Sequence, residues 1–257
     1  MVDIDGLANK LWEAQQTGTP CGPLTADEPE LTVSQAYAIQ AYNLERRDSP
    51  LLGRKIGLTS RALQEWLEVD QPDFGGLLAE MEVPLGGVVD TTKLLQPRAE
   101  AEIAFVLRDD LDFHVVTAAN VLSATEYILP AIEIIDSRIA DWKISYEDTI
   151  ADNASSGMYV LGTKPVKLAE NPFDLDLAGM VLRKNGRVVS TGAGAACMGH
   201  PVNAVVWLAN TLCKLGTPLR AGDVVLSGAL GPVTEVAPGD SVEADIAHVG
   251  RVHVRFA

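Results

Sequence analysis

The sequence lacks the features that mark disulfide-rich, zinc-binding and membrane-spanning proteins. Its three cysteines, Cys21, Cys197 and Cys213, are far apart and form no CxxC pair, so neither a disulfide framework nor a cysteine zinc site is expected. No stretch is apolar for long enough to span a bilayer, and the amino terminus has no apolar signal core. These absences predict a cytoplasmic protein in a reducing compartment.

Positive charge is also scarce. Thirty-five Asp and Glu residues stand against twenty Lys and Arg, which gives a formal net charge of −15. A field of this sign repels polyphosphate and anionic lipid, so neither nucleic acid nor a membrane is expected as a partner. An anionic small-molecule substrate would need a local positive centre, supplied by basic residues or by a bound cation.

Aromatic residues make up only 5% of the chain, but 47% hydrophobic and 21% charged residues are typical of a globular protein with a substantial core. A single domain over residues 1–257 is expected, with a helical segment at 1–68 and a β-rich catalytic part at 69–257. Apolar spacings of three and four predict helices over 3–17, from Thr32 or Ser34 to the charged stretch 45–48, and over 60–67 with Ser60 as N-cap.

Beyond Val69 the sequence changes to short apolar runs separated by Gly, Pro and Asp, which predicts strands. The expected strands are 101–107, 131–135, 158–161, 177–184, 224–226, 241–246 and 252–256. Helices are expected at 117–127 and 201–216, and the Asn185-Gly186 pair predicts a hairpin. The fold class is therefore α+β, without the regular βαβ alternation of a dinucleotide-binding fold.

Three acidic residues form the main candidate site. In a strand, Glu100 and Glu102 point to the same face, about 7 Å apart, within reach of one bridging divalent cation. Glu133 lies in the apolar run PAIEII, where an unpaired buried carboxylate is costly. Oxygen ligands favour Mg²⁺ or Mn²⁺ over zinc. A solvated edge strand explains Glu100 and Glu102 as well, so spacing alone leaves the metal site open.

Seven segments resemble one known family, in order and over nearly the whole chain. They are GRKIGLTS (53–60), DQPDFG (70–75), PRAEAEIAFVL (97–107), IEIIDSRIADWK (132–143), ADNASSG (151–157), GAGAACMGHPVNAVVWLAN (192–210) and LSGALGP (226–232). The family is that of the 2-hydroxypenta-2,4-dienoate (2-oxopent-4-enoate) hydratases, within the fumarylacetoacetate hydrolase superfamily.

The resemblance implies a fumarylacetoacetate hydrolase-type fold, a mixed β-roll or sandwich, in a homo-oligomer. It implies a Mg²⁺ or Mn²⁺ site whose ligands match Glu100, Glu102 and Glu133. The implied reaction, in meta-cleavage degradation of aromatic compounds, adds water to 2-hydroxypenta-2,4-dienoate and gives 4-hydroxy-2-oxopentanoate. Other functions left open are a 4-oxalocrotonate-type 2-oxo acid decarboxylase, a C–C bond hydrolase and a non-catalytic scaffold partner of neighbouring pathway enzymes.

The same resemblance supplies candidate catalytic residues. Lys55, in the strand-like GRKIGL, is expected to stabilise an enolate or relay its proton; the alternative is a surface lysine paired with an acid. Asp73, in an expected Pro-Asp-Phe-Gly turn, is the candidate that activates water or protonates carbon. Related 4-oxalocrotonate decarboxylases resemble the chain in its metal-binding acids but lack this aspartate, although an ordinary turn residue explains it too.

Five further residues are expected to bind substrate. Ser155 and Ser156 in ADNASSG are candidates for hydrogen bonding to a substrate carboxylate or a metal-bound water, with capping of a turn as the alternative. Ser227, Gly228 and Leu230 resemble a loop that lines the pocket, and a plain strand-end turn is the alternative.

Overall fold

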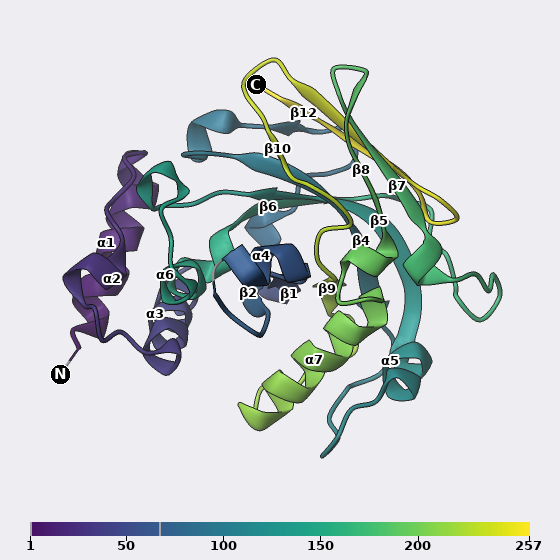
Figure 1. The fold of residues 1–257 in the computed structure, drawn as a ribbon, viewed down its shortest axis with the longest axis horizontal. Coiled ribbons are helices and arrows are strands. Elements are labelled where there is room, and N and C mark those ends of the chain that lie inside the picture. Colours follow the sequence, from purple (N-terminus) through teal and green to yellow (C-terminus); the bar gives the residue numbers. More distant parts are fainter. Residues whose placement is uncertain (1, 67) are drawn as a thin grey trace.

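The computed structural model describes residues 2–66 and 68–257, arranged as drawn in Figure 1. Leu67, the expected end of the third helix, lies outside the described residues. The α-helices are α1 (Ile4–Thr17), α2 (Leu24–Asp27), α3 (Val33–Glu45), α4 (Arg61–Trp66), α5 (Ala118–Ala124), α6 (Tyr146–Ala151) and α7 (Pro201–Lys214). Among these described helices, none combines the length and apolar character that a membrane crossing requires.

Local sequence signals set where the first helices begin and end. Asp3 caps α1 by accepting a hydrogen bond from the Gly6 N–H at 2.9 Å. Gly18 follows α1 with a φ of 66°, the left-handed conformation that glycine adopts without strain. Thr32 and Gln35 form a capping box at the start of α3, where the sequence predicts that helix to begin.

The described strands form two sheets. The larger has the order β2-β1-β9-β4-β5-β6, with β10 paired to β4, and the smaller has the order β3-β12-β11-β7-β8. Their bounds are β1 (Leu51–Gly57), β2 (Asp73–Leu78), β3 (Val88–Val89), β4 (Arg98–Leu107), β5 (Thr125–Ile135), β6 (Ser156–Leu161), β7 (Gly179–Lys184), β8 (Arg187–Ala193), β9 (Val224–Leu226), β10 (Thr234–Glu235), β11 (Ser241–Ile246) and β12 (Gly250–Phe256).

Three apolar clusters of described residues hold these layers together, the smallest around Leu77 and Tyr159 on the larger sheet. The main core joins both sheets to α7 through fully buried side chains such as Phe105, Leu182 and Leu208. A second cluster, which includes Leu11 and Ile39, packs α1, α3 and α6 against one another, on the left of Figure 1. Each fully buried side chain of this size stabilises the fold by about 1.5–3 kcal/mol. The second cluster fixes α6 beside the turn that precedes β6.

The expected strands are observed, with differences at their ends. Asn185 and Gly186 have φ values of 52° and 75°, which confirms the hairpin between β7 and β8. The helix expected over 117–127 is too long, because Thr125 already belongs to β5 and pairs with β4. The turn expected around Asp73 is wrong: Asp73 begins β2 and pairs with Gly57 of β1. In both places sheet pairing overrides local propensity.

Candidate active site

Three carboxylates meet on the larger sheet. Glu100 and Glu102 lie two residues apart on β4, and the antiparallel register places Glu133 of β5 directly opposite Glu100. One carboxylate oxygen from each residue lies within 4.8 Å of the other two. Glu100 is 8% exposed, and the other two are fully buried. The structure therefore brings together the three acids that the sequence singles out.

Lys55, on β1, is the basic residue beside these carboxylates. Its Nζ lies 3.3 Å from Glu133 Oε1 and donates a hydrogen bond to the Ala154 carbonyl oxygen at 2.9 Å. Burial lowers the pKa of Lys55, but the carboxylates of Glu133 and Asp73 outweigh it and raise that pKa above its ordinary value. The lysine is buried rather than on the surface, and it keeps its positive charge.

The carboxylate cluster is short of positive charge. Glu102 Oε1 and Glu133 Oε2 have no partner among residues 2–66 and 68–257, and Glu133 Oε1 has the Lys55 ammonium at 3.3 Å but no hydrogen bond. Such a shortage is costly for buried ionised groups. Burial, followed by the charge of Glu133, raises the pKa of Glu100 to about 8 and that of Glu102 well above its ordinary range. A divalent cation would neutralise the cluster, and its oxygen ligands suit Mg²⁺ or Mn²⁺.

Asp73 lies beside Lys55, outside the cluster of three. Its Oδ2 accepts a hydrogen bond from Thr149 Oγ1 at 3.3 Å, and its Oδ1 has no partner within the described ranges. Burial raises the pKa of Asp73, although the charge of Lys55 opposes the shift. Gly57 faces Asp73 closely enough that a Cβ there would collide with Oδ1. Asp73 is thus a buried acid with one free oxygen, which is suited to proton exchange.

The turn over residues 152–156 is held in an unusual backbone conformation. Asn153, Ala154 and Ser155 have φ values of 56°, 51° and 51°, each in the left-handed region that costs a non-glycine residue about 1–3 kcal/mol. The Asn153 side chain holds the turn by accepting a hydrogen bond from Gly76 N at 2.7 Å and donating one to Gly76 O at 3.0 Å. Strain of this kind is typical of functional sites.

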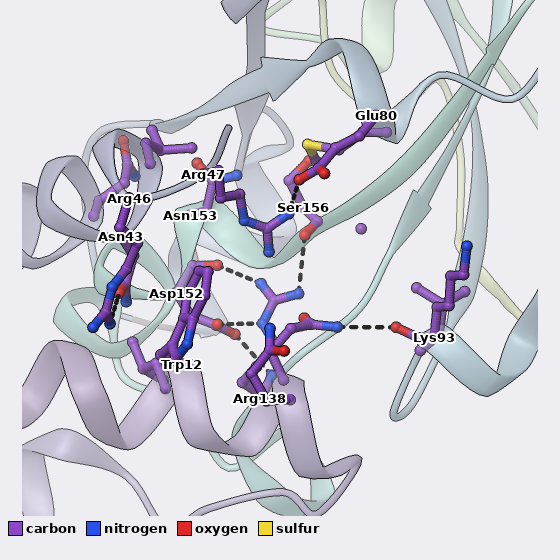
Figure 2. Close-up of a pocket in the computed structure, with 18 of the residues that line it drawn as sticks. Trp12, Asn43, Arg46, Arg47, Glu80, Lys93, Arg138, Asp152, Asn153 and Ser156 are labelled. Carbon is purple, nitrogen blue, oxygen red and sulfur yellow. Dashed lines mark hydrogen bonds and ion pairs between the residues drawn. The ribbon is translucent and has the colours of Figure 1, made fainter. Parts of the chain in front are cut away.

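The two serines of this turn face different surroundings. Ser155 Oγ lies 3.2 Å from Thr149 Oγ1, and the two hydroxyls share a hydrogen bond near Asp73. Ser156 instead lines a cavity of about 540 Å³ beside α1 and α3 (Figure 2), and its Oγ has no partner in the described part of the chain. None of the three clustered carboxylates lines this cavity. The structure places Ser155 at the candidate site and Ser156 away from it.

The loop after β9 reaches the carboxylates through its backbone. The Gly228 N–H donates a hydrogen bond to Glu102 Oε2 at 2.8 Å, with the glycine at a φ of 109°. Ser227 is fully buried, and its Oγ has no partner among the described residues. Gly228 therefore lies at the candidate site, Ser227 precedes it with a buried hydroxyl, and Leu230 packs in the main core.

The family model of the fumarylacetoacetate (FAA) hydrolase C-terminal region matches residues 61–257, more than half of the chain. The chain belongs to the fumarylacetoacetate hydrolase family. The expected family and the expected hydrolase-type fold, with helices and curled sheets, are thereby confirmed.

Two hydratases match this chain over nearly its whole length. A 2-keto-4-pentenoate hydratase of Paraburkholderia xenovorans (strain LB400) is 52% identical over 252 residues, which are 97% of this chain and 93% of the relative. A 2-hydroxyhexa-2,4-dienoate hydratase of Comamonas testosteroni is 45% identical over 260 residues, which are 98% of this chain and 97% of the relative. These full-length matches place the chain among hydratases of its family.

One solved structure also matches this chain over nearly its whole length. It is a 4-oxalocrotonate decarboxylase from Pseudomonas putida G7, complexed with magnesium and adipate. It is 36% identical, has a TM-score of 0.92, and is matched over 99% of this chain and 97% of its own. A family member with this fold therefore carries magnesium.

Arg138 supports the strained turn beside the candidate site, and the sequence reasoning missed it. It is 5% exposed, and Figure 2 shows its guanidinium between Asp152 and Ser156. It forms an ion pair with the Asp152 carboxylate and donates to the carbonyl oxygens of Asp152 at 2.6 Å and Ser156 at 3.0 Å. Arg138 thus holds both ends of the strained turn. Its position beside that turn depends on β5 and β6 pairing, so no local sequence pattern reveals its role.

Removing divalent metal should make the protein less stable as the pH rises from about 5 to 8. The folded state retains the Glu100 proton up to a pKa of about 8, whereas the unfolded chain releases it near 4.5. The folded state then binds more protons, so the free energy of unfolding falls as the pH rises through this window. Melting temperatures measured in EDTA and in Mg²⁺ should diverge toward pH 8.

The difference between the melting temperatures in EDTA and in Mg²⁺ isolates the contribution of the carboxylate cluster to stability. Other buried acids such as Asp152, whose pKa burial raises to about 6, titrate in both conditions and cancel. The Glu100→Gln variant should flatten the pH dependence seen in EDTA. A melting temperature that is the same with and without Mg²⁺ at pH 8 would contradict metal binding at the cluster.

Proposed function

We propose that this family member is a metal-dependent hydratase that converts 2-hydroxypenta-2,4-dienoate (2-oxopent-4-enoate) to 4-hydroxy-2-oxopentanoate, in meta-cleavage degradation of aromatic compounds. The observation that carries the proposal is the buried cluster of Glu100, Glu102 and Glu133 beside Lys55. It occurs in a chain whose full-length relatives are named for hydration of such dienoates.

The proposal assigns Mg²⁺ or Mn²⁺ to Glu100, Glu102 and Glu133. When bound, such an ion supplies Lewis-acid chemistry to a 2-oxo acid. Support comes from the carboxylate oxygens without partners, from the excess of buried negative charge, and from the magnesium complex of the similar decarboxylase. The cation is also the positive centre that an anionic substrate needs in a protein of charge −15.

Lys55 and Asp73 are assigned the handling of charge and protons. In the proposed sequence the dienol loses its O2 proton and gains one at C5; hydroxide from water then bonds to C4, and a proton is added at C3. The Lys55 ammonium, held by Glu133 and the Ala154 carbonyl, stabilises the developing enolate oxygen. Asp73 Oδ1, which has no protein partner in the described ranges, accepts the proton of the attacking water and returns one to C3.

Ser155 is assigned to substrate binding, because its hydroxyl lies next to the Thr149 and Asp73 pair. The roles expected for Ser156, Ser227, Gly228 and Leu230 stay predictions. Four further expectations also stay predictions: the single domain, the cytoplasmic location, the homo-oligomer and the association with neighbouring pathway enzymes.

Purified protein incubated with Mg²⁺ and 2-hydroxypenta-2,4-dienoate is expected to consume the dienoate absorbance and to form 4-hydroxy-2-oxopentanoate. No carbon dioxide should be released. EDTA should stop the reaction, and added Mg²⁺ or Mn²⁺ should restore it. If the dienoate is stable in the presence of the metal-loaded protein, the proposed hydration is wrong.

Decarboxylation is the second candidate, favoured by the 4-oxalocrotonate decarboxylase that matches with a TM-score of 0.92. Its sequence identity of 36% is lower than the 52% and 45% of the hydratases. Release of carbon dioxide from 4-oxalocrotonate, at a rate comparable with dienoate hydration, would replace the hydratase assignment by this one.

A further inference from the structure

Thr149 joins two parts of the candidate site that are far apart in the sequence. It lies on α6 and is 4% exposed. Its Oγ1 donates a hydrogen bond to Asp73 Oδ2 at 3.3 Å, and the same oxygen lies 3.2 Å from Ser155 Oγ. One hydroxyl therefore connects the first residue of β2 to the strained turn before β6.

We propose that Thr149 is a positioning residue for the hydration, one that orients the Asp73 carboxylate and fixes the direction of the Ser155 hydroxyl. The inference rests on the proposed function. A threonine hydroxyl has one proton to donate, and an ionised Asp73 takes it. Ser155 must then donate its own proton to Thr149, so Ser155 presents lone pairs to its surroundings. At the same time Asp73 Oδ1 is left free.

Helix α6 is anchored at points that keep this hydroxyl in place. The Asp148 carboxylate, next to Thr149, accepts hydrogen bonds from Leu24 N at 2.8 Å and from Thr25 Oγ1 at 2.8 Å. Tyr146 donates its hydroxyl proton to the Pro72 carbonyl oxygen at 2.7 Å, immediately before Asp73 in the chain. The same helix thus holds both the backbone and the carboxylate at the start of β2.

The branched side chain of threonine suits this task better than serine or valine. Its two Cβ substituents restrict χ1 on a helix, and the hydrogen bonds to Asp73 and Ser155 select the rotamer that is observed. Valine has nearly the same shape but lacks the hydroxyl, and serine keeps the hydroxyl but loses the methyl group. The pair of variants therefore separates hydrogen bonding from packing.

The test compares Thr149→Val with Thr149→Ser in the metal-loaded protein, with 2-hydroxypenta-2,4-dienoate as substrate. The valine variant should lose about 10- to 100-fold in kcat, the range for a hydrogen bond to a charged group, while KM changes less than about threefold. The serine variant should recover most of kcat. Thr211→Val is the matched control, because the Thr211 hydroxyl donates to Trp207 O within its own helix α7, away from the candidate site, and it should leave kcat unchanged.

Two results would overturn the role of Thr149 while leaving the hydratase assignment intact: wild-type kcat in Thr149→Val, or equal losses in the valine and serine variants. In the second result the serine variant would keep the hydroxyl and still lose activity, so the hydrogen bond alone would not explain the effect. Failure of the wild-type protein to hydrate the dienoate is a different outcome, which overturns the proposed function and the inference together.

Discussion

Replacing Glu102 by Gln is expected to abolish divalent-metal binding and to lower hydratase activity by more than about 100-fold. Even residues that only support metal ligands change affinity by about 10- to 100-fold, and Glu102 is placed as a ligand itself. The glutamine oxygen can still accept the hydrogen bond from the Gly228 N–H, so the loop should keep its conformation. The substitution removes one of three buried acidic groups and should not lower the melting temperature of the metal-free protein.

Metal binding can be measured by calorimetry with Mn²⁺, alongside the rise in melting temperature that Mg²⁺ produces in the wild type. Glu126→Gln is the matched control: Glu126 lies on β5 as Glu133 does, but it pairs with Lys167 at 3.2 Å near the surface. The control should bind metal and turn over substrate normally. Metal binding and turnover that both survive Glu102→Gln would show that the carboxylate cluster is not the active site.

Asp73→Asn is expected to lower kcat by about 10²- to 10⁴-fold, the range for loss of a general acid or base. Divalent-metal affinity should stay within about threefold of the wild-type value, because Asp73 lies outside the three clustered carboxylates. Asparagine retains an oxygen that can accept the Thr149 hydrogen bond, so the fold should be unaffected. The reason for the loss is chemical: an amide cannot exchange a proton with water or carbon at neutral pH.

The measurement is steady-state hydration at saturating metal, together with Mn²⁺ calorimetry on the same preparation. Asp109→Asn is a suitable control, since Asp109 is exposed and pairs only with its neighbour Arg108. Full activity in Asp73→Asn would remove Asp73 from the proposed proton transfer. Lost metal affinity would instead mean that Asp73 belongs to the metal site.

More of the carboxylate site than of its surroundings could be predicted from the sequence. Residue alternation in a strand put Glu100 and Glu102 on one face, and the apolar neighbours of Glu133 signalled its burial. Asp73 was recognised as a candidate but was assigned to a turn, because the Pro-Asp pair favours one locally. Pairing with β1 makes Asp73 a strand residue instead.

Residues that act through distant contacts were not predicted. Thr149 is an ordinary threonine in a short helix that has no clear apolar period, and Arg138 differs from a surface arginine only through its buried partners. Ser155 and Ser156 are adjacent and chemically identical, yet only Ser155 lies near Asp73. The strained turn separates them, and its conformation depends on Asn153 and Gly76, which are 77 positions apart.

The sequence by itself determined the features of the fold and of the carboxylate site that depend on a few neighbouring residues. Examples are the capping box at Thr32, the Asn185-Gly186 hairpin and the shared face of Glu100 and Glu102. Only the tertiary structure decided that Glu133 lies opposite Glu100, that Lys55 is buried against it, and that Thr149 reaches Asp73. Caps, turns and strand alternation are short-range effects, whereas these contacts require strand register and core packing to form first.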